Sequence, residues 1–570
     1  MRLLALLGLS TSCLLACGSS SSSQGSADAG SHDASRGGAD ASHERDGGSE
    51  GGNDAAIDAG PCPIVHPSPG PLLGLSSGAV CAYEGIPYAA PPTDSLRWKP
   101  PAPAASWSAP RPSAFASGCP QSASEFGVPS TDEDCLYLNV WTPAVHPSTP
   151  APVMVFVHGG SFVWGSGSFP LYESTSLAST TGNVVVTINY RLGALGFLSL
   201  PELRAEDPSI PTAGNYGILD QIAAFAWVKA NIAAFGGDPS NVTIFGESAG
   251  GTSMLIHLAS PKSAGLFEHV MIESGYAPNR AGAGPEAAGD SIGATFASAV
   301  GCSGSALLSC LRSASLTAIM NESESPTLGD TTAFTWFPIV DDYLLSDYPI
   351  RRIVNGTFNK VPTLLGTNKN EGTLFVLTSP PTDQASFVSM ADVSFPGNGA
   401  AVATEYPVVG DAGAPDAATP DGGIPLFSTY EAAAAQALTD GAFVCPARQI
   451  ARALTSAGVP TYRYEFTHAI DLGIPNLGVF HGSELEFVFG NLVNSLAPPI
   501  TPAEGTLSTE MMGYWGAMAA GGSPNGGGRL MWPVYSMATE PDLVLDLTLS
   551  TETELEKAQC DFWDALPTMP

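Results

Sequence analysis

Three short runs of apolar residues, rich in valine and isoleucine, recur in the first half of the chain. They span residues 153–157, 184–188 and 242–245. Residues 218–232, between the second and third runs, form a longer apolar stretch typical of a helix. Continuous apolar runs that alternate with helices are typical of strands covered by helices on both faces. The pattern therefore predicts an α/β fold with a mostly parallel central sheet.

The third run ends at a sharp turn that presents a serine. Four β-branched or aromatic residues precede Gly246, and an apolar helical run at 254–258 follows Gly250. The Gly-x-Ser-x-Gly pattern around Ser248 says little alone, because a chain with 63 glycines also carries it around Ser49, Ser76 and Ser291. The strand and helix context selects Ser248, and this context is that of the nucleophile elbow of an α/β-hydrolase. A serine buried for packing is the alternative.

The chain begins with the features of an exported protein. Residues 1–17 hold one arginine and then an apolar run too short to span a bilayer, which predicts a signal peptide. Its end, Leu-Leu-Ala-Cys, resembles a bacterial lipobox, so we expect Cys17 to carry lipid; an ordinary cleavage site is the alternative. Residues 18–60 contain almost no large apolar residue, which predicts a flexible tether or a tail that serves only solubility. We expect a cell-envelope lipoprotein or a secreted protein.

The remaining sequence, residues 61–570, is expected to form a single domain. A low-complexity insertion near 410–424 has the composition of the tether, and we expect a mobile surface segment there; a lid is the alternative. No later run is long and apolar enough for a membrane helix, so any membrane attachment would be through lipid. The formal net charge of −33 argues against nucleic acid as a partner. The sequence carries no signal for the oligomeric state.

The order of the chain narrows the choice of a catalytic base and acid. In an α/β-hydrolase the nucleophile is followed first by an acid and then by a histidine. Of nine histidines, this order leaves His468 and His481. His468 closes a strand-like alternation, whereas His481 stands next to glycine in a loop before a helix. Glu371 lies in a polar turn after an apolar strand, where the acid is expected, and a solvated loop glutamate is the alternative.

Several longer motifs resemble those of the type-B carboxylesterase and cholinesterase family. They are Glu-Asp-Cys-Leu-Tyr-Leu-Asn-Val-Trp at 133–141, His-Gly-Gly-Ser-Phe at 158–162, Asn-Tyr-Arg-Leu-Gly at 189–193, Asn-Ile-Ala-Ala-Phe-Gly-Gly-Asp-Pro at 231–239 and the elbow at 246–250. The resemblance extends from about residue 75 to the C-terminus. It implies an α/β-hydrolase fold and a serine carboxylic ester hydrolase that acts on small esters through an acyl-enzyme, without metal or cofactor.

The resemblance also assigns roles to individual residues. It implies a catalytic triad of Ser248, Glu371 and His481. The other implied positions are backbone donors to an oxyanion at Gly160, Ser161 and Ala249, support for the triad from Glu247 and Ser274, and a structural ion pair between Arg97 and Glu133. The family commonly has glycine where this chain has Ser161.

Substrate preference is expected from two regions. The family's choline-binding tryptophan belongs between Cys119 and Cys135, where this chain offers only Phe126. We therefore do not expect choline esters to be substrates. Phe334 and Trp336 resemble the family's aromatic acyl-pocket wall, while Thr332 is small where choline-selective members carry bulk. We therefore expect short or medium acyl esters.

Eight cysteines remain after Cys13 in the signal and Cys17, and an exported protein can keep them oxidised. By resemblance to the family, six of them pair as Cys119–Cys135, Cys302–Cys310 and Cys445–Cys560. Cys62 and Cys81 are left, and we expect them to pair with each other. None of the cysteines has a spacing typical of a zinc or redox site.

Two alternatives to an ester hydrolase remain. A catalytically silent adhesion protein of the same fold would lack the serine, which this chain has. Carbamate, amide or polyester hydrolysis would use the same residues, and only substrate profiling separates these activities.

Overall fold

The computed structural model describes residues 62–124, 127–144, 149–275, 283–324, 335–377, 379–408, 429–470, 472, 476–492 and 500–566. All of them belong to the unit Ala59–Pro570. The predicted signal peptide, tether and lipidated Cys17 lie outside the described residues, as does the insertion near 410–424.

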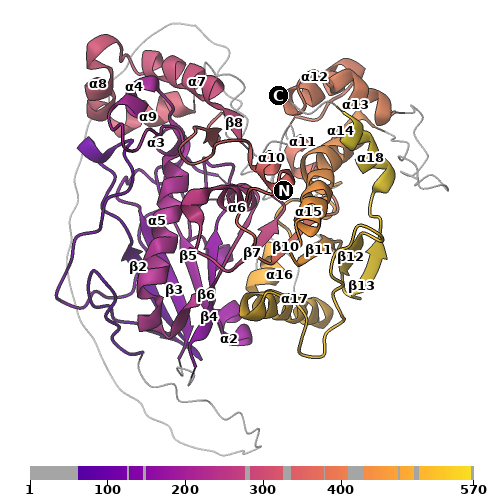
Figure 1. The fold of residues 1–570 in the computed structure, drawn as a ribbon, viewed down its shortest axis with the longest axis horizontal. Coiled ribbons are helices and arrows are strands. Elements are labelled where there is room, and N and C mark those ends of the chain that lie inside the picture. Colours follow the sequence, from indigo (N-terminus) through magenta and orange to yellow (C-terminus); the bar gives the residue numbers. More distant parts are fainter. Residues whose placement is uncertain are drawn as a thin grey trace, which may run out of the picture. The chain divides into compact units, whose positions relative to one another are not determined.

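A mixed sheet forms the centre of this unit (Figure 1). Within the described residues its eleven strands run in the order β1-β2-β3-β5-β4-β6-β7-β10-β11-β12-β13. Their bounds are β1 Leu75–Ser77, β2 Val80–Pro87, β3 Tyr137–Pro143, β4 Ala151–Val157, β5 Val184–Ile188, β6 Gly237–Glu247, β7 His269–Glu273, β10 Thr363–Asn368, β11 Thr461–Phe466, β12 Pro541–Leu545 and β13 Ser550–Thr553. β8 (Gly284–Pro285) and β9 (Ile339–Val340) pair separately.

The middle of the sheet is parallel and its edges are antiparallel. Each neighbouring pair from β5 to β12 is parallel, while β1, β2 and β3 on one side and β13 on the other pair antiparallel. The three predicted runs are β4, β5 and the second half of β6. The predicted α/β-hydrolase fold with a mostly parallel sheet is confirmed.

Helices cover both faces of the sheet, because side chains of a parallel strand alternate between two buried faces. In β4, Val153, Val155 and Val157 pack into one core with α5 (Tyr216–Asn231) and α6 (Ala249–Ala259). Met154 and Phe156 point the other way, into a core with α2 (Thr175–Thr181), α16 (Leu485–Phe489) and α17 (Pro502–Gly521).

The remaining helices extend these layers. They are α3 Gly193–Phe197, α4 Pro201–Ala205, α7 Glu286–Ala299, α8 Leu307–Ser313, α9 Leu316–Ser323, α10 Pro349–Val354, α11 Thr373–Val376, α12 Gln384–Ser394, α13 Gly399–Glu405, α14 Tyr430–Leu438, α15 Cys445–Ser456 and α18 Lys557–Ala565. A π-helical turn, Thr439–Val444, joins α14 to α15. A third core unites α12, α13, α14, this turn and α18.

Helix α5 continues into a 3-10 turn, and the segment Tyr216–Phe235 contains a window with a mean hydropathy of 1.3 that is by length and composition able to cross a membrane. The expectation that no later run is long and apolar enough was therefore wrong. Of the residues in this window 56% are buried inside the protein. A buried ion pair fixes it there, since Asp220 accepts hydrogen bonds from the Arg191 guanidinium at 2.7 Å. We therefore assign it as a core helix.

All four predicted disulfides are formed: Cys62–Cys81, Cys119–Cys135, Cys302–Cys310 and Cys445–Cys560. The first pins the start of the domain to β2. The last closes 115 residues of chain and fastens α18 to the start of α15.

Candidate active site

The turn between β6 and α6 holds Ser248 in a strained backbone conformation. Its φ of 58° and ψ of −119° lie outside the regions that serine normally adopts. The flanking glycines let strand and helix approach, since a Cβ on Gly250 would lie 2.0 Å from the carbonyl oxygen of Val157. Strain held in place by close packing is the local geometry of a nucleophile elbow.

Glu371 and His481 meet beside this turn, although 110 residues separate them. The Oε2 atom of Glu371 lies 2.5 Å from Nδ1 of His481. Its other carboxylate oxygen accepts hydrogen bonds from the Ser274 hydroxyl and the backbone N–H of Asn368, both at 2.6 Å. Glu371 follows the end of β10 by three residues and is fully buried, so the alternative of a solvated loop glutamate is wrong. Ser274, for which a role in supporting the triad is predicted, thus contacts the carboxyl group of Glu371.

The His481 ring is enclosed on two sides by aromatic rings. The centroids of Phe375 and Phe443 lie 5.1 and 4.9 Å from that of the imidazole. The Nε2 atom is 3.2 Å from Oε1 of Glu247, without the geometry of a hydrogen bond. No hydrogen bond joins His481 to Ser248 within the described residues, and such nucleophile–base bonds are commonly looser before substrate binds.

Glu247 connects the nucleophile turn to the histidine. A Cβ placed on Gly159 would lie 3.0 Å from Cβ of Ser248 and 2.8 Å from Oε2 of Glu247, so these groups are neighbours. A Cβ on Gly482, the residue after His481, would lie 3.5 Å from Oε1 of the same carboxyl. The triad candidates and the glycine turn at 159–160 therefore converge on one site.

Buried carboxyl groups dominate the electrostatics of this site. Burial raises the pKa of Glu247 to about 7, with the negative Glu371 adding to the effect. Burial opposes protonation of His481, but the charges of Glu247 and Glu371 and the hydrogen bond to Glu371 outweigh it, so its pKa is raised. The imidazolium that forms when a base takes a proton is thus stabilised here.

Two further carboxyl groups, which were not predicted from the sequence, lie near the site. Burial raises the pKa of Glu273 to about 8, although the Trp515 indole donates a hydrogen bond to it at 2.8 Å. Burial also raises the pKa of Glu484, which accepts a hydrogen bond from Nδ2 of the Asn368 side chain. Glu484 could have been noticed three residues after His481 at the start of a helix. Nothing in the sequence points to Trp515.

The segment after β4 turns so that two backbone N–H groups have no acceptor among the described residues. These belong to Gly160, with φ of 94°, and Ser161, with φ of 55°. Ala249, the first residue of α6, likewise has no carbonyl of its own helix to bind. Ser161 adopts a left-handed conformation that glycine would enter without cost. Ser161 thus occupies a turn conformation that favours glycine.

The sequence of the chain matches a known protein family. The model of the carboxylesterase family matches residues 61–563. The chain belongs to the carboxylesterase family. It is 35% identical over 545 residues to a cholinesterase of Mus musculus, across 88% of this chain and 86% of the mouse protein.

Solved esterases share the fold of this carboxylesterase. A PNB esterase structure matches with a TM-score of 0.75 and 31% identity, covering 89% of this chain and 99% of the other. The carboxylesterase EST55 of Geobacillus stearothermophilus matches with a TM-score of 0.75 and 30% identity, over 88% and 99% of the two chains. The protein is therefore an esterase of the carboxylesterase and cholinesterase family.

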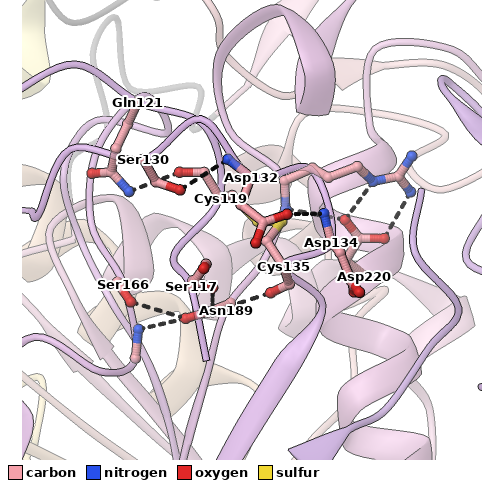
Figure 2. The surroundings of a disulfide bond; sticks show 12 residues. Ser117, Cys119, Gln121, Ser130, Asp132, Asp134, Cys135, Ser166, Asn189 and Asp220 are labelled. Atoms are coloured by element: carbon pink, nitrogen blue, oxygen red, sulfur yellow. Dashed lines mark hydrogen bonds and ion pairs between the residues drawn. A yellow bond between two sulfur atoms is a disulfide. The ribbon is translucent and has the colours of Figure 1, made fainter. Parts of the chain in front are cut away.

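Polar contacts join the loop that Cys119–Cys135 closes in this esterase to neighbouring segments of the chain. Arg97 and Glu133 form the expected ion pair, with two nitrogen–oxygen distances of 2.6 and 2.5 Å. Next to it, the Asn189 amide donates to the carbonyls of Ser117 and Cys135, both at 3.1 Å, and accepts from Ser166 (Figure 2). The loop closed by Cys119–Cys135 is thereby attached to the chain that follows the glycine turn.

The predicted acyl-pocket wall is only partly within the described residues. Phe334 lies outside them, as do Thr332 and Phe126. Trp336 is buried, donates a hydrogen bond to the Ser323 carbonyl at 2.9 Å and packs edge-on against Phe296. Its role at an acyl pocket stays a prediction.

Phe337, which follows Trp336 in the chain, contacts the segment after the glycine turn. The Phe337 ring meets the Phe162 ring at a centroid distance of 5.2 Å, and Phe162 directly follows Ser161.

No group of three or more His, Cys, Asp or Glu side chains within the described residues is arranged to hold a metal ion.

Proposed function

We propose that this esterase hydrolyses short and medium acyl esters through an acyl-enzyme on Ser248, with His481 as base and Glu371 as the acid that orients it. The contact between Glu371 and His481, buried next to the strained serine, carries the proposal. A carboxylate on Nδ1 fixes the tautomer whose Nε2 accepts a proton. It also stabilises the imidazolium that results.

Each step then has a group to perform it. His481 takes the proton of Ser248 as the hydroxyl attacks the ester carbonyl. The N–H groups of Gly160, Ser161 and Ala249 donate to the oxyanion, each contributing about 3 kcal/mol to the transition state. The imidazolium gives its proton to the departing alcohol, and water repeats the sequence to release the acid.

The negative charge of Glu247 favours the protonated intermediate state of His481. Ser274 holds one oxygen of Glu371, so that the other oxygen is free for the imidazole. These are supporting roles, since neither side chain bonds to the substrate or transfers a proton in the proposed mechanism.

A panel of substrates tests the proposed preference. The panel contains p-nitrophenyl esters from acetyl to octanoyl, palmitoyl ester as an emulsion, and acetylcholine, with the Ser248→Ala variant as the blank. We expect the highest kcat/KM among the shorter acyl esters and no activity of the variant. Activity confined to long-chain emulsions or to choline esters would refute the preference. Carbamate, amide and polyester substrates in the same panel separate the rival hydrolase activities.

We also propose that the protein is exported and tethered through lipid on Cys17. The support is the arrangement of the sequence: an apolar leader, the Leu-Leu-Ala-Cys end and a tether-like segment to residue 60. Full-length protein made in a bacterium should partition into detergent, whereas a Cys17→Ala variant should stay in the aqueous phase. Equal partitioning of the two would refute lipidation at this residue.

A further inference from the structure

The direction of each oxyanion donor is set by the carbonyl that shares its peptide bond. In a trans peptide the C=O and the N–H point in opposite directions, so a hydrogen bond that holds one also aims the other. The three proposed donors belong to the peptides 159–160, 160–161 and 248–249. What holds their carbonyl oxygens therefore decides whether the N–H groups point into the site.

Two of these carbonyls are held by backbone. The oxygen of Ser248 accepts from the N–H of Thr252 at 2.8 Å, as in any first turn of a helix. The oxygen of Gly160 accepts from the N–H groups of Val163 and Trp164 at 3.0 and 2.9 Å. These bonds aim the N–H groups of Ala249 and Ser161 whatever side chains surround them.

The third carbonyl, that of Gly159, is held by a side chain. Nδ1 of His158 lies 2.8 Å from it, and because a carbonyl oxygen can only accept, Nδ1 carries the proton. Burial lowers the pKa of His158 to about 4, so the ring is neutral near pH 7. The ring stacks on Tyr190 at 4.4 Å, and the Tyr190 hydroxyl donates to the His158 carbonyl at 3.0 Å. The hydrogen bond from Tyr190 thus fixes the backbone of His158, and the stack on Tyr190 fixes the face of its imidazole ring.

Behind this contact the chain leaves no free space. A Cβ on Gly165, which has a φ of 109°, would lie 2.2 Å from Nδ1 of His158 and 2.7 Å from the Gly159 oxygen. The buried side-chain amide of Gln121 holds Gly165 with two hydrogen bonds of 2.8 Å. The amide oxygen accepts from the Gly165 N–H, and the amide nitrogen donates to the Gly165 carbonyl. The same amide donates to the carbonyl of Cys119 at 3.1 Å, beside the disulfide in Figure 2.

We propose that His158 is a positioning residue for the oxyanion hole: its Nδ1–H fixes the Gly159–Gly160 peptide and so aims the Gly160 N–H at the oxyanion. Gln121 holds Gly165 against this pair and links it to the loop closed by Cys119–Cys135. The inference rests on the proposed function, because it deepens the role of one of its donors.

Two substitutions at His158 separate the hydrogen bond from the packing. In His158→Asn, the side-chain Nδ2 occupies nearly the place of Nδ1 and keeps a donor, but the ring is lost. In His158→Phe, the ring and its stack on Tyr190 are kept, but the donor is lost. We expect His158→Phe to lower kcat/KM by about 10- to 100-fold, below the 10²- to 10³-fold loss of a deleted donor. His158→Asn should retain most of the activity.

The affinity for a trifluoromethyl ketone distinguishes positioning of the oxyanion hole from a merely structural role, because loss of structural support alone would leave this affinity unchanged in the folded enzyme. Such ketones form a tetrahedral oxyanion on the serine, so in His158→Phe their affinity should fall by the same factor as kcat/KM, while the melting temperature changes little. Equal activity of the two variants, or an unchanged ketone affinity in His158→Phe, would overturn the proposal.

A third variant covers the case in which His158→Phe does not fold. Gln121→Glu keeps the acceptor for the Gly165 N–H and removes the donor to its carbonyl; we expect a smaller loss with the same parallel change in ketone affinity. An unchanged ketone affinity in a folded Gln121→Glu variant would also count against the inference. An inactive wild-type enzyme would instead refute the proposed function, so the two failures are distinguishable.

Discussion

The charge of Glu247 is predicted to set the pH at which the esterase becomes active. Activity requires neutral His481, so the acid limb of kcat/KM against pH reports the pKa of this histidine in the free enzyme. Replacing Glu247 by Gln keeps the shape of the side chain and removes a negative charge 3.2 Å from Nε2. The imidazolium loses a stabilising partner, its pKa falls, and the acid limb moves to lower pH.

The distance gives an upper bound for this shift. Two unit charges 3.2 Å apart interact by about 5 kcal/mol at an effective dielectric constant of about 20, which corresponds to nearly four pKa units. The carboxyl carries only part of its charge near neutral pH, because burial raises its own pKa to about 7. A downward shift of about 1 to 2 units is therefore expected.

The assay is kcat/KM for a p-nitrophenyl ester across the pH range in which the substrate is stable. Glu273→Gln is the matched control, because Glu273 is bonded to Trp515 and its charge is not among the causes that shift the pKa of His481. It should move the acid limb little. An acid limb that stays in place in Glu247→Gln, or moves to higher pH, would refute the electrostatic account of the site.

Three further predictions concern the triad and the stability of the fold. Glu371→Gln should lower kcat by about 10³- to 10⁴-fold with little change in melting temperature, measured with the same ester. Replacing both Cys445 and Cys560 by serine opens a loop of 115 residues and should lower the free energy of unfolding in urea by up to about 5 kcal/mol; an unchanged midpoint would contradict this. Gly250→Ala places a methyl group 2.0 Å from a backbone carbonyl of β4 and should destabilise the protein by about 3 kcal/mol or more. In the control Gly505→Ala the methyl group meets nothing within 4 Å, and this helical position should gain about 1 kcal/mol.

The sequence predicted those parts of the fold that depend on local pattern. The valine-rich runs became β4, β5 and the end of β6, because a strand buried on both faces must be apolar throughout. β11 departs from this rule, because it reads as an alternation of apolar and polar residues and is nevertheless buried along its whole length. Its polar residues are accommodated inside, as when Arg463 forms an ion pair with the buried Asp542.

Contacts between distant segments could not be predicted from the sequence, because they leave no periodic pattern of residues. The hydrogen bond from Trp515 to Glu273 joins α17 to β7 across 242 residues. Phe443 reaches the His481 ring from a π-helical turn for which the chain carries no distinctive signal. The choice between His468 and His481 likewise needed either the family motif or the structure. Both ring nitrogens of His468 lie instead within hydrogen-bond distance of carboxyl groups, those of Asp546 and Glu504.

Labelling of Ser248 with a fluorophosphonate tests the central claim most directly. The probe bonds only to a serine that a neighbouring base activates in the folded protein. Native enzyme should gain one adduct, which mass spectrometry should map to the peptide containing Ser248. Esterase activity should fall in proportion to the labelled fraction. Urea-unfolded protein and the Ser248→Ala variant should gain no adduct. Esterase activity that survives in Ser248→Ala, or a native protein that stays unlabelled at this serine, would contradict the account.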